Sequence, residues 1–130
     1  MNKSPVLKPK EKPVLRLVAP YDQRALGEQI LGGWLLTQCD YCAGLYARQT
    51  IGNAIIRAIS NLVFHAPLFA GECYEVFAQT IKTGNTSLTI ELSGWAQPRD
   101  YRQDVGEKLV LTAEVILVAI DEKGKPRSIQ

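Results

Sequence analysis

Residues 32–48, GGWLLTQCDYCAGLYAR, form the stretch that most restricts how this chain folds. They are predicted to form one helix, and Asp40 is the only charged side chain between Glu28 and Arg48. A helix that is apolar on nearly every face is typical of a protein interior, where other elements cover it. A carboxylate there must be paired, hydrogen-bonded, shifted in pKa or used in chemistry. Asp40 is therefore a candidate functional residue, and a purely structural buried carboxylate is the alternative.

The residue spacing predicts two faces on this helix. One face, formed by residues three or four apart, carries mostly small side chains around the carboxylate: Gly33, Leu36, Asp40, Ala43 and Ala47. Because these neighbours are small, another chain or a ligand could approach Asp40 closely. A second stripe is expected to face the core and consists of Leu35, Cys39, Cys42 and Tyr46.

Length and charge exclude several classes of protein. The 130 residues predict one domain with a substantial core, and 15 basic against 13 acidic residues are too balanced for a nucleic-acid surface. No apolar run approaches the ~20 residues of a membrane span. The N-terminal sequence MNKSPVLKPKEKP lacks the apolar region of a secretory signal, which indicates a cytoplasmic protein.

The three cysteines do not indicate a disulfide framework, a redox centre or a metal site. Cys39 and Cys42 form a C-x-x-C motif, but it lies in the middle of the helix, whereas thioredoxin-type motifs open a helix after a strand. A single histidine, His65, and no second cysteine pair leave too few ligands for zinc. We therefore expect neither a metal nor a cofactor.

Residues 1–13 alternate lysines with prolines and are expected to form a flexible N-terminal arm, so residues 14–130 form the single domain. Residues 14–19 are predicted to form a short strand, and residues 21–31 a loop leading into the helix. Gly52-Asn53 is predicted to close the helix.

Four strands are expected after the helix. The strand at 54–64 is followed by a turn at 65–71, in which His65 is expected to be structural. Two alternating runs, 72–82 and 87–97, flank a Gly-Asn turn and predict a β-hairpin, and residues 98–106 are expected to be polar and exposed. The longest strand is predicted at 108–121, before a charged tail. This order predicts an antiparallel sheet curling around one helix, with a second copy completing the burial.

Two sequence blocks carry a family resemblance. One is the helix, with Gly-Gly-Trp-Leu at 32–35 followed by Gln38, Asp40, Ala43 and Ala47, and the other is the turn Lys-Thr-Gly-Asn-Thr-Ser at 82–87. Together they are fairly specific, and the match extends over roughly residues 15–127. The chain resembles the bacterial hotdog-fold acyl-CoA thioesterases of the short- and medium-chain type. The fold implied is α+β, an antiparallel sheet wrapped around one long central helix.

The resemblance implies hydrolysis of acyl-CoA to free fatty acid and CoA at an interface between subunits of a homo-oligomer. In the family the helix carboxylate is catalytic, and Asp40 stands at that position. Amides near Gly32 and Gly33 are expected to bind the oxyanion. The turn residues expected near CoA, with an ordinary hairpin turn as the alternative, are Lys82, Gly84, Asn85, Thr86 and Ser87.

The chain also departs from the family. An Asn-x-Asn-Gly-Asp segment usually precedes the Gly-Gly pair, and this chain has Ala25-Leu26-Gly27-Glu28-Gln29 there, or Arg24 after a one-residue shift. The arginine that often follows the post-helix glycine is also absent, since Ala54 follows Asn53. A non-catalytic hotdog protein that binds acyl-CoA or a related thioester is therefore the alternative. A hotdog dehydratase or a lipid-responsive regulator ranks last, because dehydratases of this fold use a histidine in the helix region and His65 lies after the following strand.

Overall fold

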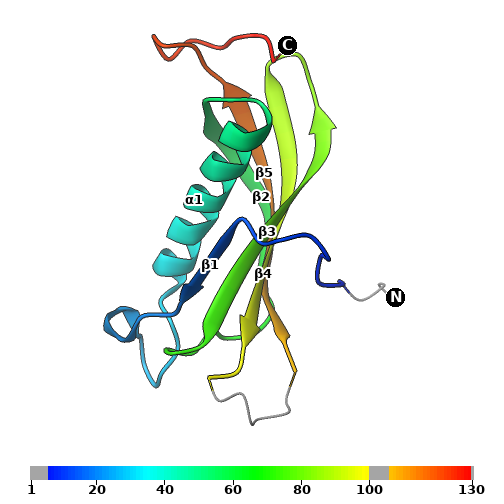
Figure 1. Cartoon of the computed structure of the whole chain (residues 1–130). Coiled ribbons are helices and arrows are strands. Elements are labelled where there is room, and N and C mark those ends of the chain that lie inside the picture. The colour runs from blue at the N-terminus through cyan, green and yellow to red at the C-terminus, as the bar shows by residue number, and fades with distance from the viewer. Residues whose placement is uncertain (1–5, 100–105, 130) are drawn as a thin grey trace.

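The computed structural model describes residues 6–99 and 106–129. Within them lie one long helix, α1 (Gly32–Thr50), a 3-10 turn, η1 (Tyr21–Gln23), and five strands: β1 (Leu15–Val18), β2 (Ala54–Phe64), β3 (Cys73–Thr83), β4 (Ser87–Gln97) and β5 (Lys108–Ala119). The strands form one antiparallel sheet in the order β1-β3-β4-β5-β2, and α1 lies against one face of it (Figure 1). The predicted α+β architecture is confirmed.

The predicted element boundaries hold to within about two residues. The helix begins at Gly32 as expected and ends at Thr50, two residues later than the predicted stretch. Gly52 adopts a positive φ of 95° and its N–H donates to the carbonyl of Ala47 at 2.8 Å, which closes the helix. The last strand ends at Ala119 rather than at residue 121. Most of the segment expected to be exposed at 98–106 lies outside the described residues.

The core forms where α1 meets the sheet. Leu35, Cys39 and Cys42 are buried as the sequence predicts, while Tyr46 of the same stripe is only half-buried. They face strand residues that are almost completely buried: Tyr74, Val76, Ile90, Leu92, Val115 and Leu117. Along β5, every second residue from Leu111 to Ala119 is buried, so one side of this strand faces the core.

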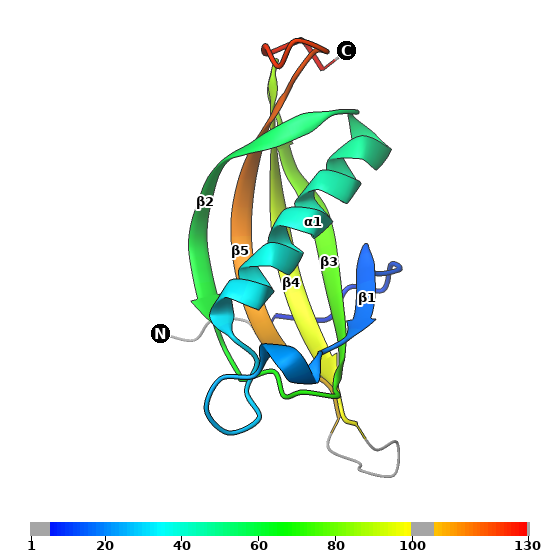
Figure 2. The ribbon, with the colours of Figure 1, turned by 90° about the vertical axis from the view of Figure 1, so that its left-hand side faces the viewer.

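The expectation that α1 is enclosed on nearly every face is wrong for the single chain. Gly33, Leu36 and Asp40 are exposed, although Ala43 and Ala47 of the same predicted face are buried. Figure 2 shows the reason, because α1 crosses the strands obliquely and different sides of it meet the sheet along its length. The helix therefore keeps one open side near its middle.

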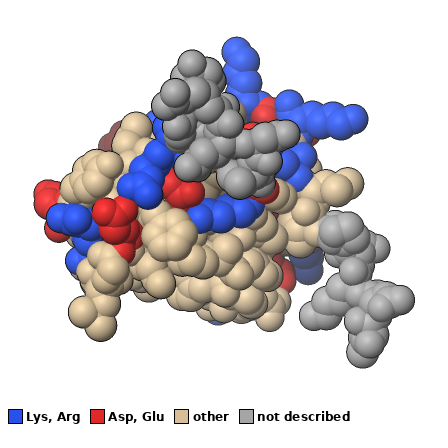
Figure 3. Space-filling view, turned by 90° about the horizontal axis from the view of Figure 1, so that it is seen from below, with Lys and Arg blue, Asp and Glu red and all other residues tan. Residues whose placement is uncertain are grey.

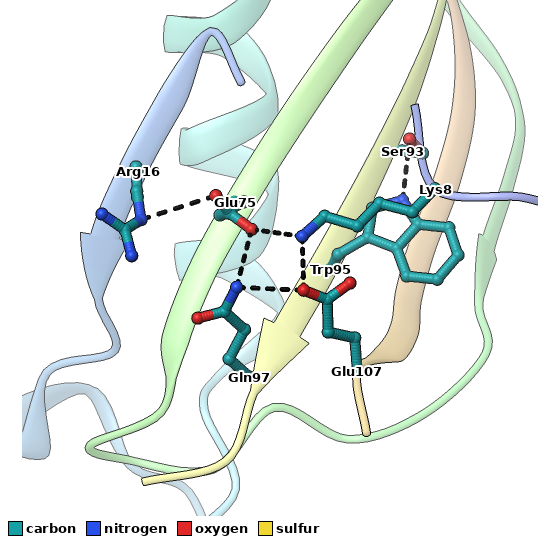
Figure 4. A network of polar contacts seen from close by, with 7 residues as sticks. All are labelled: Lys8, Arg16, Glu75, Ser93, Trp95, Gln97 and Glu107. Atoms are coloured by element: carbon teal, nitrogen blue, oxygen red, sulfur yellow. Dashed lines mark hydrogen bonds and ion pairs between the residues drawn. The ribbon is translucent and has the colours of Figure 1, made fainter. Parts of the chain in front are cut away.

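The outer face of the sheet is crossed by residues 6–13. The Nζ atom of Lys8 lies 2.7 Å from Glu75 Oε1 and 2.6 Å from Glu107 Oε1, and Gln97 donates to the same two oxygens (Figure 4). Burial acts to lower the pKa of Lys8, but its hydrogen bonds to Glu107 and Glu75 outweigh burial, so its pKa is raised. Glu75 is 6% exposed, so these bonds compensate a nearly buried carboxylate.

The division of the chain into a flexible arm at residues 1–13 and a single domain at residues 14–130 stays a prediction.

The charged side chains are mixed on the end of the molecule where α1 begins. Figure 3 shows Lys and Arg next to Asp and Glu on this face, with a broad uncharged area beside them. The side chains of Arg99 and Glu28 form an ion pair, with Nη1 2.7 Å from Oε2. In the described part of the chain, no helix has the length and apolarity needed to cross a membrane.

Candidate functional site

Asp40 lies in the middle of α1 on its open side. It lines a groove of about 730 Å³ between the helix, the start of β2 and the segment that follows β5. The other lining residues are Tyr41, Gly44, Leu45, Arg48, Asn53, Ala54, Ile55, Ile120, Asp121, Glu122 and Gly124. The side chain is thus open to a ligand or to another chain.

The carboxylates of this groove differ in how they are held. Asp121 Oδ1 accepts hydrogen bonds from the backbone N–H groups of Lys123 at 2.8 Å and Lys125 at 3.0 Å, so it stabilises a turn. Asp40 makes no hydrogen bond or ion pair to any residue in the described ranges 6–99 and 106–129. The structural alternative, a buried carboxylate bonded to a backbone amide or a threonine, is not what the structure shows. Asp40 is therefore available for chemistry.

Gly32 and Gly33 begin α1, where the first N–H groups of a helix have no partner within the helix. A Cβ added to Gly33 would meet nothing within 4 Å, so the helix start is open. Gly32 also lines a groove of about 350 Å³ beside Phe64, His65 and Leu68. The sequence places Asp40 eight residues after Gly32, which is about 12 Å along a helix.

The predicted CoA-binding turn joins β3 and β4 at the opposite end of the helix from Gly32 (Figure 1). The Gly84 N–H donates to the Ser87 carbonyl at 2.7 Å, and the Ala119 N–H donates to the Thr86 carbonyl at 2.8 Å. A Cβ at Gly84 would lie 2.6 Å from Ser87 Oγ, so a larger residue there requires the Ser87 side chain to move. Within one chain, the turn and the two helix-start glycines do not form a single site.

The segment that departs from the family forms a short loop before α1. The Ala25 N–H donates to the Gln29 carbonyl at 2.7 Å, Gly27 has a φ of 68°, and Leu26 is 91% exposed at the tip. Arg24 donates to the carbonyl of Tyr21 at 2.7 Å. An exposed apolar side chain therefore stands in the segment where the family pattern has an amide.

The remaining polar candidates are structural. His65 Nε2 lies 2.7 Å from Thr112 Oγ1, which gives the ring a partner within the sheet. Burial raises the pKa of the Cys39 thiol to about 11 and that of Cys42 to about 12, so neither is a reactive thiolate near neutral pH. No cluster of histidine, cysteine and carboxylate side chains suited to a metal ion occurs in the described residues.

Sequence reasoning missed Arg127, which binds backbone carbonyls around the groove. Its guanidinium donates to Ile120 O at 2.9 Å, to Ile51 O at 2.7 Å and to Asn53 O at 3.2 Å. Two of its partners, Ile51 and Asn53, lie more than seventy residues away in sequence, so no local spacing indicates them. The one signal was its place at the end of the stretch, roughly residues 15–127, over which the sequence resembles the family.

The sequence from residue 29 to residue 102 matches the thioesterase superfamily model, which is more than half of the chain. The chain belongs to the thioesterase superfamily. A Zymomonas mobilis protein named as an uncharacterized acyl-CoA thioester hydrolase is 33% identical over 96% of this chain and 83% of its own length. The acyl-CoA thioester hydrolase YciA of Salmonella typhimurium is 32% identical over 92% of this chain and 90% of its own length.

Solved structures of this superfamily confirm the hotdog fold. A hexameric thioesterase of Yersinia pestis has a TM-score of 0.88 and 27% sequence identity, covering 95% of this chain and 99% of its own. A hexameric hotdog-fold thioesterase of Campylobacter jejuni has a TM-score of 0.86 and 27% identity, covering 92% and 91%. The fold and family implied by the sequence resemblance are therefore confirmed.

Proposed function

We propose that this superfamily member is an acyl-CoA thioester hydrolase with Asp40 as its catalytic carboxylate. The observation that carries the proposal is the exposed Asp40 side chain, which faces an open groove without a partner in the described chain. Relatives about one-third identical over nearly the whole chain are named as acyl-CoA thioester hydrolases.

The chemistry needs a carboxylate beside the thioester carbonyl and donors for its oxygen. Asp40 either removes a proton from water as the water attacks the carbonyl carbon, or attacks that carbon itself. In both routes water supplies the hydroxyl of the free acid, the C–S bond breaks, and the CoA sulfur leaves and takes up a proton. The free N–H groups at Gly32 and Gly33 are suited to hold the developing oxyanion.

These two parts are too far apart to act on one carbonyl within a single chain. Asp40 and Gly32 are about 12 Å apart along α1, whereas each must lie about 3 Å from the reacting group. A site that uses both therefore needs the carboxylate of one copy and the helix start of another. The proposal accordingly includes a homo-oligomer with the site between subunits.

The surface around Asp40 supports this assembly. Large apolar side chains are exposed on the open side of α1 and on β2, which is an edge strand: Leu36, Tyr41, Leu45, Ile55, Ile59, Val63 and Phe64. Exposed apolar residues next to an unpaired strand edge are typical of a surface that another chain covers. The neighbours from Yersinia pestis and Campylobacter jejuni are both described as hexameric.

The turn Lys82–Ser87 is proposed to bind the CoA part of the substrate. Lys82 is exposed and supplies a positive charge for a phosphate, and the tight turn holds Asn85 and Thr86 in a fixed orientation. Because this turn lies beyond the C-terminal end of α1 and Asp40 lies in the middle of that helix, the CoA part would extend from the thioester at Asp40 toward the helix end. A cytoplasmic location stays a prediction from the N-terminal sequence.

The test is a thiol-release assay of the purified protein with acyl-CoAs from acetyl to stearoyl, beside Asp40→Asn. We expect wild-type turnover and a loss of about 10²–10⁴-fold in Asp40→Asn, with unchanged fold and assembly, because the amide cannot act as base or nucleophile. Equal turnover by both proteins would exclude Asp40 as the catalytic group. Saturable acyl-CoA binding without turnover in wild type would instead establish the non-catalytic alternative.

The altered loop before α1 is what favours that alternative. Its tip presents Leu26, 91% exposed, where the family pattern has an amide-rich segment. If the site depended on such an amide to position water, wild type would bind acyl-CoA and release no thiol. The assay therefore separates the two functions without any further variant.

A further inference from the structure

The segment after β5, residues 120–129, is a structured strap between two parts of the proposed site. It turns back on itself, with Ile120 paired to Pro126 and the Asp121 N–H donating to the Lys125 carbonyl at 2.8 Å. The Arg127 N–H then donates to the Ala119 carbonyl at 2.9 Å. The returning half therefore has a fixed place beside the end of β5.

Arg127 fastens this strap to the end of α1. Its Nη2 atom donates to Ile51 O at 2.7 Å and to Asn53 O at 3.2 Å, while its Nε donates to Ile120 O at 2.9 Å. The carbonyls at a helix C-terminus carry partial negative charge, which favours a cation there. Gly52 makes the approach possible, because a Cβ at this position would lie 2.7 Å from Nη2.

One end of the strap forms a wall of the Asp40 groove. Its four contributing residues are Ile120, Asp121, Glu122 and Gly124. The other end holds the β3–β4 turn, since the Ile129 N–H donates to Asn85 O at 2.9 Å and Ser128 Oγ donates to Asn85 Oδ1 at 3.2 Å. A single anchored segment therefore connects the catalytic groove with the turn proposed to bind CoA.

We propose that Arg127 is a positioning residue that sets the place of the CoA-binding turn relative to Asp40, acting through residues 128–129 on Asn85. The inference rests on the proposed function, because it concerns the same site. Loss of the guanidinium bonds frees the strap at the end of α1. The backbone bonds beside Ala119 remain, but residues 128–129 then hold Asn85 less firmly, and the CoA end of the substrate meets a less ordered turn.

Lysine cannot replace arginine in this role. The guanidinium reaches these three carbonyls through two nitrogen atoms of one rigid planar group, with Nε bonded to Ile120 O and Nη2 bonded to both Ile51 O and Asn53 O. A lysine ammonium is a single charged group on a flexible chain, so it cannot bond to all three carbonyls at once. Arg127→Lys therefore keeps the charge and removes the guanidinium bonds.

Lys125→Ala is the matched control, because it removes a positive charge from the same strap. In the described turn, only the backbone of Lys125 is bonded.

A second pair of variants tests the link to the turn alone. Ile129→Pro removes the N–H that donates to Asn85 O and leaves Arg127 in place. Ile129→Ala is its control, because it shortens the side chain and keeps the N–H. Thermal unfolding of all variants identifies any that fail to fold.

The measurement compares kcat and KM for the acyl-CoA that wild type hydrolyses fastest and for the S-acyl pantetheine with the same acyl chain. Acyl pantetheine lacks the nucleotide, so it does not report on a turn that binds the nucleotide end. We expect the ratio of kcat/KM for acyl-CoA to kcat/KM for acyl pantetheine to fall about tenfold in Arg127→Lys and about threefold in Ile129→Pro, mainly through KM. Both controls are expected to keep the wild-type ratio.

Two results would overturn the inference. An equal loss for both substrates in Arg127→Lys and Ile129→Pro would show a general structural role, and an unchanged ratio would show that the strap does not position the turn. Failure of the proposed function is a separate result, because wild type itself would then release thiol from neither substrate.

Discussion

The two sides of α1 differ in what they contain and in what covers them. The side against the sheet carries Leu35, Cys39 and Cys42, each at most 4% exposed, and it is closed by strand residues of the same chain. The opposite side carries Leu36, Asp40 and Tyr41, and the chain leaves it open. We call these the closed side and the open side of α1. The closed side stabilises the fold, and the open side presents the candidate catalytic group.

The largest expected effect tests this separation with two adjacent leucines. Leu35 is 4% exposed and Leu36 is 38% exposed. Leu35→Ala is expected to lower the unfolding free energy by about 2–5 kcal/mol, because it leaves a cavity in the core. Leu36→Ala is expected to lower it by about 1 kcal/mol or less within the chain and to weaken self-association.

Urea unfolding at several protein concentrations, beside light scattering, measures both quantities. If both substitutions lower the unfolding free energy equally and neither changes self-association, the two sides of α1 do not differ in the way described.

Gly94 tests how tightly the closed side is packed. An added Cβ would lie 2.6 Å from Cζ of Tyr74, the ring that fills the space above this glycine. Gly94→Ala is therefore expected to destabilise the protein by about 1–3 kcal/mol through overpacking. Thermal or urea unfolding measures the change, and Gly33→Ala at the open helix start, where a Cβ meets nothing within 4 Å, is the sterically matched control.

The cysteines test whether the closed side stays closed in solution. Burial raises the pKa of Cys39 to about 11, so at pH 8 about one molecule in a thousand carries its thiolate, and the pKa of Cys42 is higher still. Cys73 is only half-buried. We expect iodoacetamide at pH 8 to alkylate Cys73 at least tenfold faster than the other two in native protein.

Mass spectrometry of the peptides reports each site, and urea should make all three thiols reactive. Alkylation of Cys39 as fast as Cys73 in native protein would mean that the helix opens from the sheet.

The smallest expected effect concerns the hydroxyl of Tyr74. It is buried and has no hydrogen-bond partner among the residues that the structure describes. Tyr74→Phe removes an unsatisfied polar group and keeps the ring that packs 6.0 Å from Trp34. We expect it to leave the unfolding free energy unchanged or to raise it by up to about 1 kcal/mol. A loss of more than about 1 kcal/mol in urea unfolding would show that the hydroxyl has a partner in solution.

Much of the fold could be predicted because its signals are local. The strand at 54–64 and the run at 87–97 were placed at their observed bounds, since alternation and turn residues act between near neighbours. The burial of Leu35, Cys39 and Cys42 followed from helical spacing. Asp40 was identified as an isolated charge, but its exposure was not predicted, because the angle at which α1 crosses the sheet is not encoded in spacing.

The sequence by itself determined the elements, their order, the closed side of the helix and the family, because each depends on residue types at short and regular spacing. The tertiary structure decided that Asp40 faces an open groove, that Gly32 and the turn at 82–87 lie at opposite ends of α1, and that Arg127 joins the strap to the helix end. These facts depend on distances between segments far apart in the chain. Only the packing of the folded chain fixes such distances.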